Sequence, residues 1–287
     1  MMIETVRLPF GGKDNATLTI YSYEMREKPV IRKRPTVLIA PGGGYGEVSD
    51  RESEVVALRF LAWGYNAAVL TYSVAKDAVF PQSLCEAALA MAYLKENAER
   101  FFIDQSRIYT CGFSAGAHLA LSLGVFWDKK WLSDAVGKKN ELLRPTAQII
   151  CYPVVTGDPE FGHAGSYKKL LGEDSSEEKK ELLSLEKQVT KNTPPTFLWT
   201  TQTDATVPCE NSLMLAAALQ KEKIPMEFHL YGWGRHGLSV ADINTQTPKN
   251  LSSDFLDSHV QPHVATWLPL CKEWLEVKFG IETKENE

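Results

Sequence analysis

A serine set between glycines is the clearest chemical signal in the chain. Ser114 is the centre of the run 112–116, which reads Gly-Phe-Ser-Ala-Gly. An apolar stretch of strand length, 107–111, precedes this run, and a stretch typical of a helix, 117–121, follows it. Small residues two positions from the serine on either side let a strand and a helix cross closely beneath a sharp turn. The pattern predicts an exposed nucleophilic serine, and a glycine-rich loop between a strand and a helix is the alternative.

Two further side chains complete a catalytic set with Ser114. A serine hydroxyl is a poor nucleophile at neutral pH, so it needs a nearby base and a carboxylate that orients this base. Asp204 comes just after a predicted strand at 196–201, and His236 follows the last predicted strand in a glycine-flanked loop. The chain order Ser, Asp, His is the order expected when each group follows a strand of one α/β sheet. We therefore predict Asp204 as the acid and His236 as the base, with helix N-capping as the alternative role of Asp204.

The remaining histidines fit structural roles better. His118 lies one helical turn beyond Ser114, so we expect it to pack beneath the turn. His229 alternates with apolar residues on a predicted strand, and His259 and His263 come at the start of the last predicted helix, where capping or solvation is expected. His163 lies in a polar segment from which it could reach a substrate, with simple loop exposure as the alternative.

A glycine-rich loop follows another predicted strand. Residues 41–46 read Pro-Gly-Gly-Gly-Tyr-Gly, directly after the apolar run 36–40. Acyl transfer needs N–H donors for the oxyanion, and consecutive glycines let backbone N–H groups turn toward a substrate. We expect one donor from Ala115 and a second one from this loop. Neither the Lys-Ser/Thr of a phosphate-binding loop nor the spacing G-x-G-x-x-G is present, so phosphate binding is disfavoured.

Strands and helices alternate along most of the chain, as the positioning of these groups requires. Two extended stretches flank a turn at 11–15 and predict an N-terminal hairpin. Ser49 with Glu52 predicts a capping box for a helix that carries Val55, Val56, Phe60 and Trp63 and is closed by Gly64. Further strands are expected at 36–40, 67–72, 107–111, 147–152, 196–201 and 226–232, and further helices at 82–99, 209–221 and 260–278, the last one disturbed by Pro269. This alternation predicts an α/β fold with one doubly wound, mostly parallel sheet and an antiparallel N-terminal hairpin.

One segment departs from the alternation. Residues 156–192 are polar and carry only short helical patches, so they are either a solvated surface excursion or a cap-like insertion over the site. No repeat or linker divides the chain, and we expect a single domain over residues 1–287.

Composition limits the function classes. The formal net charge is −5 and no dense basic cluster occurs, which disfavours nucleic acid and anionic membrane partners. The N-terminus lacks a basic start followed by an apolar segment, which favours a cytoplasmic protein. The five cysteines are scattered and odd in number, so we expect reduced packing residues and no metal site; no organic cofactor is implied either.

Taken together, the motifs resemble those of small bacterial α/β-hydrolases of the acetyl-xylan-esterase-like, carbohydrate esterase group, which are related to hormone-sensitive-lipase type esterases. The motifs are residues 41–45, 49–52, 112–118, 193–197, 204–208 and 234–237, and the resemblance covers roughly residues 30 to 278. It implies an α/β-hydrolase fold with the triad Ser114, Asp204 and His236, and with oxyanion donors from Gly43, Gly44 and Ala115. Pro41 is a departure, because the lipase-type relatives usually begin this loop with histidine.

These residues predict a serine carboxylesterase that hydrolyses short-chain acetyl esters through an acyl-enzyme, with O-acetylated sugars or oligosaccharides as the expected substrates. Its partner is thus a small-molecule ester. Tyr45 and Trp233 offer aromatic faces for a sugar, although core packing is an alternative, and His163 is a third candidate contact. The alternatives are another α/β-hydrolase activity, such as that of a lipase, formamidase or peptidase, or a non-catalytic ligand-binding protein.

Overall fold

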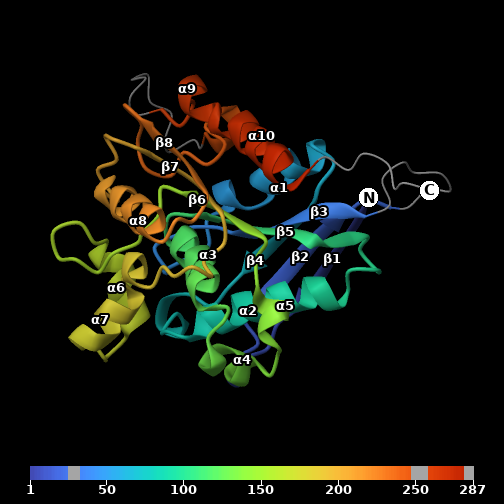
Figure 1. Ribbon diagram of the computed structural model, residues 1–287, viewed down its shortest axis with the longest axis horizontal. Helices are drawn as coiled ribbons and strands as arrows, with labels where there is room; N and C mark the ends of the chain where they lie inside the picture. The colour runs from blue at the N-terminus through green and yellow to red at the C-terminus, as the bar shows by residue number, and fades with distance from the viewer. Residues whose placement is uncertain (25–32, 247–257, 281–287) are drawn as a thin grey trace.

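Eight strands form one sheet, as the computed structural model shows for residues 1–24, 33–246 and 258–280 (Figure 1). The strands are β1 Met2–Arg7, β2 Thr17–Ser22, β3 Arg34–Ala40, β4 Asn66–Thr71, β5 Ile103–Phe113, β6 Ala147–Cys151, β7 Thr196–Thr201 and β8 Met226–Tyr231. Their order across the sheet is β1-β2-β4-β3-β5-β6-β7-β8. The hairpin β1–β2 is antiparallel and β2 joins β4 in the antiparallel sense, whereas the other neighbours pair in parallel. The predicted sheet and its hairpin are confirmed, and the chain has the α/β-hydrolase fold.

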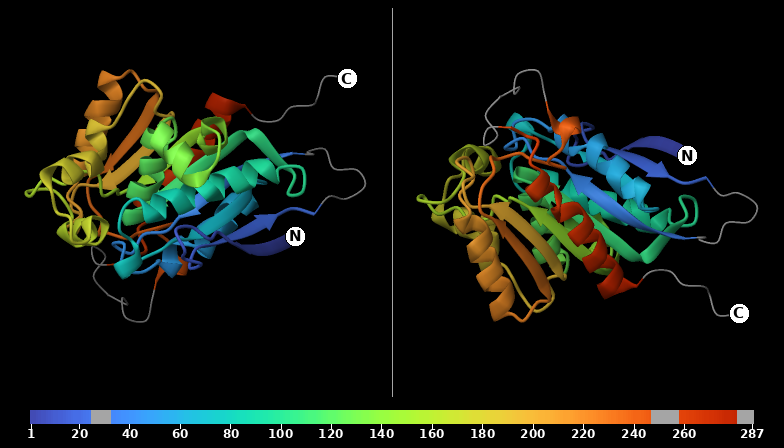
Figure 2. Two further views of the ribbon diagram at one scale, coloured as in Figure 1. Left: turned by 90° about the horizontal axis from the view of Figure 1, so that it is seen from below. Right: turned by 90° about the horizontal axis from the view of Figure 1, so that it is seen from above.

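Helices cover both faces of the sheet (Figure 2). The α-helices are α1 Glu54–Ala62, α2 Gln82–Glu96, α3 Ala115–Phe126, α4 Lys130–Val136, α5 Asn140–Leu143, α6 Ala164–Leu171, α7 Glu177–Leu183, α8 Glu210–Lys221, α9 Pro262–Ala265 and α10 Trp267–Phe279. Short 3-10 helices are η1 Asp50–Glu52, η2 Ala75–Asp77, η3 Leu185–Lys187 and η4 Ile243–Thr245. Helices α1 and α10 lie on one face and pack with one buried cluster, while α2, α3 and α8 pack with a second cluster on the opposite face.

The alternation of side chains along the strands produces these two cores. In β3, Val37 and Ile39 belong to the cluster under α1 and α10, and Leu38 and Ala40 belong to the cluster under α2 and α3. Because successive residues of a strand point to opposite faces, a continuous apolar strand is what a doubly covered sheet requires. The central strands are thereby fixed in register, and their carboxyl ends carry the loops of the site.

The helices differ from expectation in one respect, because α4 and α5 lie outside the predicted ranges. The last predicted helix is divided into α9 and α10, with Pro269 in the first turn of α10, in line with the expected disturbance by this proline. The first four N–H groups of a helix have no intrahelical acceptor, so proline is tolerated there. The polar segment 156–192 forms α6, α7 and η3 and buries Leu170 and Leu183 in the core cluster of α3. Figure 1 places α6 and α7 at the end of the sheet away from the chain termini.

The expected capping box is wrong. Glu52 ends η1, and α1 begins at Glu54 without a side-chain cap from Ser53 or Ser49. The carboxylate of Glu52 is buried and accepts the backbone N–H of Gly42 instead. A contact to the glycine-rich loop, ten residues earlier, has thus replaced the local one that the spacing suggests.

All five cysteines are buried and unpaired, as expected of packing residues. No helix within the described ranges is both long and apolar enough to cross a bilayer.

Candidate active site

Ser114 occupies a strained turn between β5 and α3. Its φ and ψ are +55° and −119°, a conformation that residues with a side chain rarely adopt, and its N–H donates to the carbonyl of Cys151 at 3.0 Å. A Cβ added to Gly112 would lie 2.3 Å from the carbonyl oxygen of Gly116, and one added to Gly116 would lie 2.1 Å from that of Ala40. The two glycines are therefore steric requirements of the crossing beneath the serine, as the sequence predicts.

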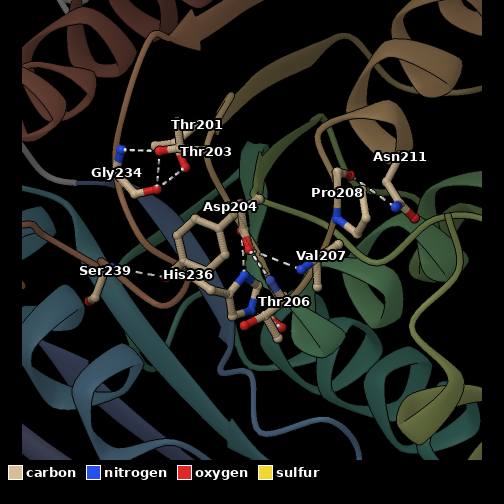
Figure 3. Close-up of polar contacts among 12 residues, drawn as sticks. Thr201, Thr203, Asp204, Thr206, Val207, Pro208, Asn211, Gly234, His236 and Ser239 are labelled. Atoms are coloured by element: carbon tan, nitrogen blue, oxygen red, sulfur yellow. Dashed lines mark hydrogen bonds and ion pairs between the residues drawn. The ribbon is translucent and has the colours of Figure 1, made fainter. Parts of the chain in front are cut away.

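The three predicted catalytic side chains meet at the carboxyl ends of the strands. His236 Nε2 lies 2.7 Å from Ser114 Oγ, and His236 Nδ1 lies 2.6 Å from Asp204 Oδ2. The other carboxylate oxygen, Oδ1, accepts the backbone N–H groups of Thr206 at 2.8 Å and Val207 at 2.9 Å (Figure 3). With Asp204 accepting, Nδ1 carries the imidazole proton of neutral His236, so Nε2 faces the serine as an acceptor.

Hydrogen bonds between the loop of the acid and the loop of the base hold the two loops together. Thr201 Oγ1 and Thr203 Oγ1 donate to the carbonyl of Gly234 at 2.9 and 3.1 Å, and this ties the end of β7 to the loop that carries His236 (Figure 3). Helix α8 begins only at Glu210, with Cys209 as its N-cap residue. Asp204 therefore does not cap α8, and its buried carboxylate bonds to the imidazole of His236 instead.

The glycine-rich loop 41–46, hereafter the oxyanion loop, lies beside the serine. Gly42 donates its N–H to Glu52 Oε2 at 2.7 Å and is thus not available to a substrate. Gly43 has φ of +121°, and a Cβ there would lie 2.1 Å from the carbonyl oxygen of Glu47. Within the described part of the chain, the N–H groups of Gly43 and Gly44 have no hydrogen-bond acceptor. These are the two loop residues that the family resemblance implies as oxyanion donors.

Tyr45 is buried under this loop. Its ring is 1% exposed and its O–H bonds to His118 Nδ1 at 3.0 Å, while His118 Nε2 donates to the carbonyl of Leu183 at 3.0 Å. Burial lowers the pKa of His118 to about 4, so the ring is neutral near pH 7. The expectation that Tyr45 offers a face to a sugar is wrong, whereas His118 packs beneath the turn as expected.

The other two candidate contacts lie close to the catalytic set. Trp233 is 44% exposed and lines a pocket of about 560 Å³ together with His236. His163 is the N-cap residue of α6, and its Nδ1 accepts the N–H of Ser166 at 3.2 Å. Burial and the charge of nearby His236 lower the pKa of His163. A Cβ on Gly44 would lie 3.6 Å from His163 Cε1, which places this ring against the oxyanion loop.

Two residues near the site were misjudged or missed. His259 is fully buried and its Nε2 lies 2.8 Å from Arg51 Nη1, so the expected capping or solvation is wrong. The spacing of Glu52 suggests only a helix cap, whereas its carboxylate bonds both to the oxyanion loop and to Tyr152. An acidic residue between a glycine-rich loop and the next helix is the only signal that the sequence carries for it. Among residues 1–24, 33–246 and 258–280, no cluster of three or more His, Cys, Asp or Glu could hold a metal ion.

Comparisons with known proteins agree with this geometry. Residues 18–219 match the family model described as BD-FAE. The chain is 38% identical over 214 residues to endo-1,4-beta-xylanase B of Butyrivibrio fibrisolvens, and the match covers 73% of this chain but only 33% of that protein.

Two solved structures are similar over nearly their whole length. An acetyl ester-xyloside bifunctional hydrolase from Caldicellulosiruptor lactoaceticus is 35% identical with a TM-score of 0.77, over 93% of this chain and 89% of that one. The carboxylesterase Cest-2923 from Lactobacillus plantarum WCFS1 is 26% identical with a TM-score of 0.84, over 99% of this chain and 100% of that one.

Proposed function

We propose that this chain, which belongs to the BD-FAE family, is a serine carboxylesterase that hydrolyses short acyl esters, in particular O-acetyl groups on a sugar or small oligosaccharide. The resemblance to acetyl-xylan-esterase-like α/β-hydrolases drawn from the motifs is confirmed at the level of the family. The observation that carries the proposal is the continuous hydrogen-bond chain from Ser114 Oγ through His236 to the buried Asp204, at 2.7 and 2.6 Å. Esterase names among the similar structures support the hydrolase assignment.

The reaction would proceed through an acyl-enzyme. Ser114 Oγ attacks the carbonyl carbon of the ester while its proton passes to His236 Nε2, and negative charge develops on the carbonyl oxygen. The N–H groups of Ala115 and of Gly43 or Gly44 would bind this oxyanion. His236 then returns the proton to the leaving alcohol as the C–O bond breaks. Water deprotonated by His236 attacks the acyl-enzyme in the same way and releases acetate and the free serine.

Two side chains are suited to hold the alcohol part of the ester. His163 accepts a backbone N–H at Nδ1, so neutral His163 carries its proton on Nε2 and offers a donor near Gly44. Trp233 is half-exposed beside His236, in a pocket large enough for a sugar unit. The exposed face of an indole ring is a common platform for an apolar face of a ligand.

Ser114→Ala tests the assignment of the nucleophile. The substitution removes one hydroxyl at a turn and opens no core cavity, so the variant should fold while ester turnover falls by about 10³-fold or more. A fluorophosphonate should label the wild-type protein once and the variant not at all, as intact-protein mass spectrometry would measure. Turnover of the variant above about a hundredth of the wild type would contradict the proposal, given the losses typical of triad removal.

A substrate panel tests the acyl group and the alcohol. The segment 156–192 near the site is rich in charged side chains, which disfavour the burial of long acyl chains. Acetyl and propionyl esters should therefore have higher kcat/KM than esters of eight carbons or more, and acetylated sugars should release acetate. Faster hydrolysis of the long esters would point to a lipase, and faster cleavage of amides would point to a peptidase or formamidase.

A further inference from the structure

We infer that Glu52 is a positioning residue that fixes the oxyanion loop and the loop of the catalytic base to each other. This inference rests on the proposed esterase function. Glu52 is 2% exposed, and each of its carboxylate oxygens has its own donor. Oε2 accepts the N–H of Gly42 at 2.7 Å, and Oε1 accepts the O–H of Tyr152 at 2.7 Å. Gly42 directly precedes the predicted oxyanion donors, so the first bond holds the loop that must present them.

The second bond leads to the loop of the base. Tyr152 accepts the N–H of Ser239 at 2.9 Å, and Ser239 follows His236 by three residues. The ring of Tyr152 packs edge-on against the imidazole of His236, with ring centroids 5.1 Å apart. Ser239 Oγ also donates to the carbonyl of Arg51 at 2.6 Å, next to Glu52 in the chain. The two arms of Glu52 therefore reach the two loops that have to act on one substrate.

The direction of these bonds requires a carboxylate at position 52. Ser239 N–H donates to Tyr152, Tyr152 O–H donates to Glu52, and Gly42 N–H donates to Glu52 as well. A carboxylate can accept at both oxygens, but a carboxamide of the same shape has one accepting and one donating end. In Glu52→Gln the amide group would therefore oppose either the N–H of Gly42 or the O–H of Tyr152, and one donor would be buried without a partner.

Backbone strain gives a reason why the loss of a bond should move the loops. Tyr152 and Ser239 have φ of +36° and +53°, where residues with a side chain are strained. Such conformations persist only while the surrounding contacts hold them. Releasing one arm of Glu52 should therefore let the base or the oxyanion donors shift without unfolding the protein.

Glu52→Gln provides the test, measured on 4-nitrophenyl acetate with the full chain. One oxyanion-hole donor typically contributes about 10²–10³ to kcat, so its partial misplacement should lower kcat by about tenfold or more. KM should stay within about threefold, because the variant removes no group that contacts the substrate. The rate at which a fluorophosphonate labels Ser114 should fall in parallel, since this reagent also places an oxygen in the oxyanion hole.

Glu86 supplies the matched control. It is 1% exposed and its carboxylate accepts Ser73 N–H, Ser73 Oγ–H and Gln82 Nε2–H, but it has no bond to either catalytic loop. Glu86→Gln should lower the urea midpoint of unfolding and leave kcat within about twofold of the wild type, because it also buries an unpaired donor. A fall in kcat confined to Glu52→Gln supports the inference.

Tyr152→Phe separates the two arms, since it cuts the bond to the base loop and keeps the bond to Gly42. Its kcat should fall less than that of Glu52→Gln. Equal kcat in Glu52→Gln and Glu86→Gln would overturn the inference. If Glu52→Gln does not fold, Tyr152→Phe replaces it, and a native kcat in Tyr152→Phe would then overturn the inference. A wild-type protein without ester turnover would instead refute the proposed function, which distinguishes the two failures.

Discussion

Two histidines come close to Ser114, His236 through its side chain and His118 through a backbone hydrogen bond, and only His236 has partners suited to proton transfer. His236 approaches from a loop at the strand ends, with a carboxylate on Nδ1 and the serine hydroxyl on Nε2. His118 lies beneath, inside α3, with the phenol of Tyr45 on Nδ1 and the carbonyl of Leu183 on Nε2. Both rings have two hydrogen-bond partners, at 2.6 and 2.7 Å for His236 and at 3.0 Å on both nitrogens of His118. The number of partners therefore does not tell a catalytic histidine from a structural one.

The chemistry of the partners makes the difference. Asp204 can stabilise the imidazolium that forms when His236 takes a proton, and the serine can supply that proton. The carbonyl of Leu183 favours a protonated His118 only weakly, because it carries no full charge, and a protonated Nδ1 could no longer accept the O–H of Tyr45. Water reaches the two sites differently as well, since the side chain of His236 is 17% exposed and His118 is 1% exposed.

The largest effect on kcat should come from Asp204→Asn, which replaces the hydrogen-bond acceptor of His236 Nδ1 with a donor. The carbonyl oxygen of the new amide has to accept the N–H groups of Thr206 and Val207, so its NH₂ group faces His236 Nδ1. The imidazole then carries its proton on Nε2 and cannot accept one from Ser114. We expect kcat to fall by about 10⁴-fold with little change in fold, as steady-state kinetics and circular dichroism would measure.

The control for this change is Asp104→Asn, which alters an ion pair with Arg107 at the opposite end of β5. It should affect only stability. If the two variants lost activity to the same extent, the orientation of His236 by Asp204 would not be the cause.

The three side chains of the proposed triad could be located from the sequence because their signals are local. The turn of Ser114 is encoded in the five residues 112–116, and Asp204 and His236 each come shortly after a recognisable strand. The sheet then brings the strand ends together by rules that hold across parallel sheets. The fold was predictable for the same reason, because every central strand is a short apolar run between turn residues.

The roles of Tyr45 and Glu52 could not be predicted, since their partners are distant in the chain. Tyr45 bonds to His118 and Glu52 bonds to Tyr152, and neither pair shares a sequence pattern. The spacing of Ser49 and Glu52 even indicated a different, local bond. Burial decides such roles, and burial depends on how loops pack against helices after the sheet has formed.

A smaller effect should come from the protonation of His118, and it should appear in the free energy of unfolding. Its pKa is lowered to about 4 in the folded protein and is about 6.5 in the unfolded chain, so between these values the unfolded state binds more protons. His118 therefore leaves the free energy of unfolding nearly unchanged above about pH 7, and its protonation lowers this free energy as the pH drops toward 4, by about 2 kcal/mol at pH 5. We expect His118→Gln to lose less stability than the wild type between pH 7 and pH 5, as measured by urea unfolding.

This experiment also tests the contrast with His236. His118→Gln should keep kcat/KM at pH 7 within about tenfold of the wild type, whereas removal of a triad member costs about 10³-fold or more. Parallel stability curves for the wild type and His118→Gln would show that His118 is not the group whose protonation destabilises the fold.

The smallest effect should come from Tyr45→Phe, which removes one oxygen between the oxyanion loop and His118. The phenyl ring can keep its edge contacts with Tyr72 and His118, whose centroids lie 5.9 and 5.8 Å away. The loop also stays tied by the bond from Tyr72 O–H to the carbonyl of Pro41 at 2.7 Å. We therefore expect the free energy of unfolding to fall by roughly 1 kcal/mol, the cost of leaving His118 Nδ1 without its donor.

Steady-state kinetics decide whether the bond from Tyr45 O–H to His118 only stabilises the fold or also affects substrate binding. Because the ring of Tyr45 is buried and touches no substrate, KM for an acetylated sugar should be unchanged in Tyr45→Phe, and kcat should change less than in Glu52→Gln. Trp233→Ala is the companion variant, since its half-exposed ring lies beside His236 and should raise KM for the sugar ester more than for 4-nitrophenyl acetate. A raised KM in Tyr45→Phe with native stability would reverse this assignment and place the phenol oxygen in contact with the substrate.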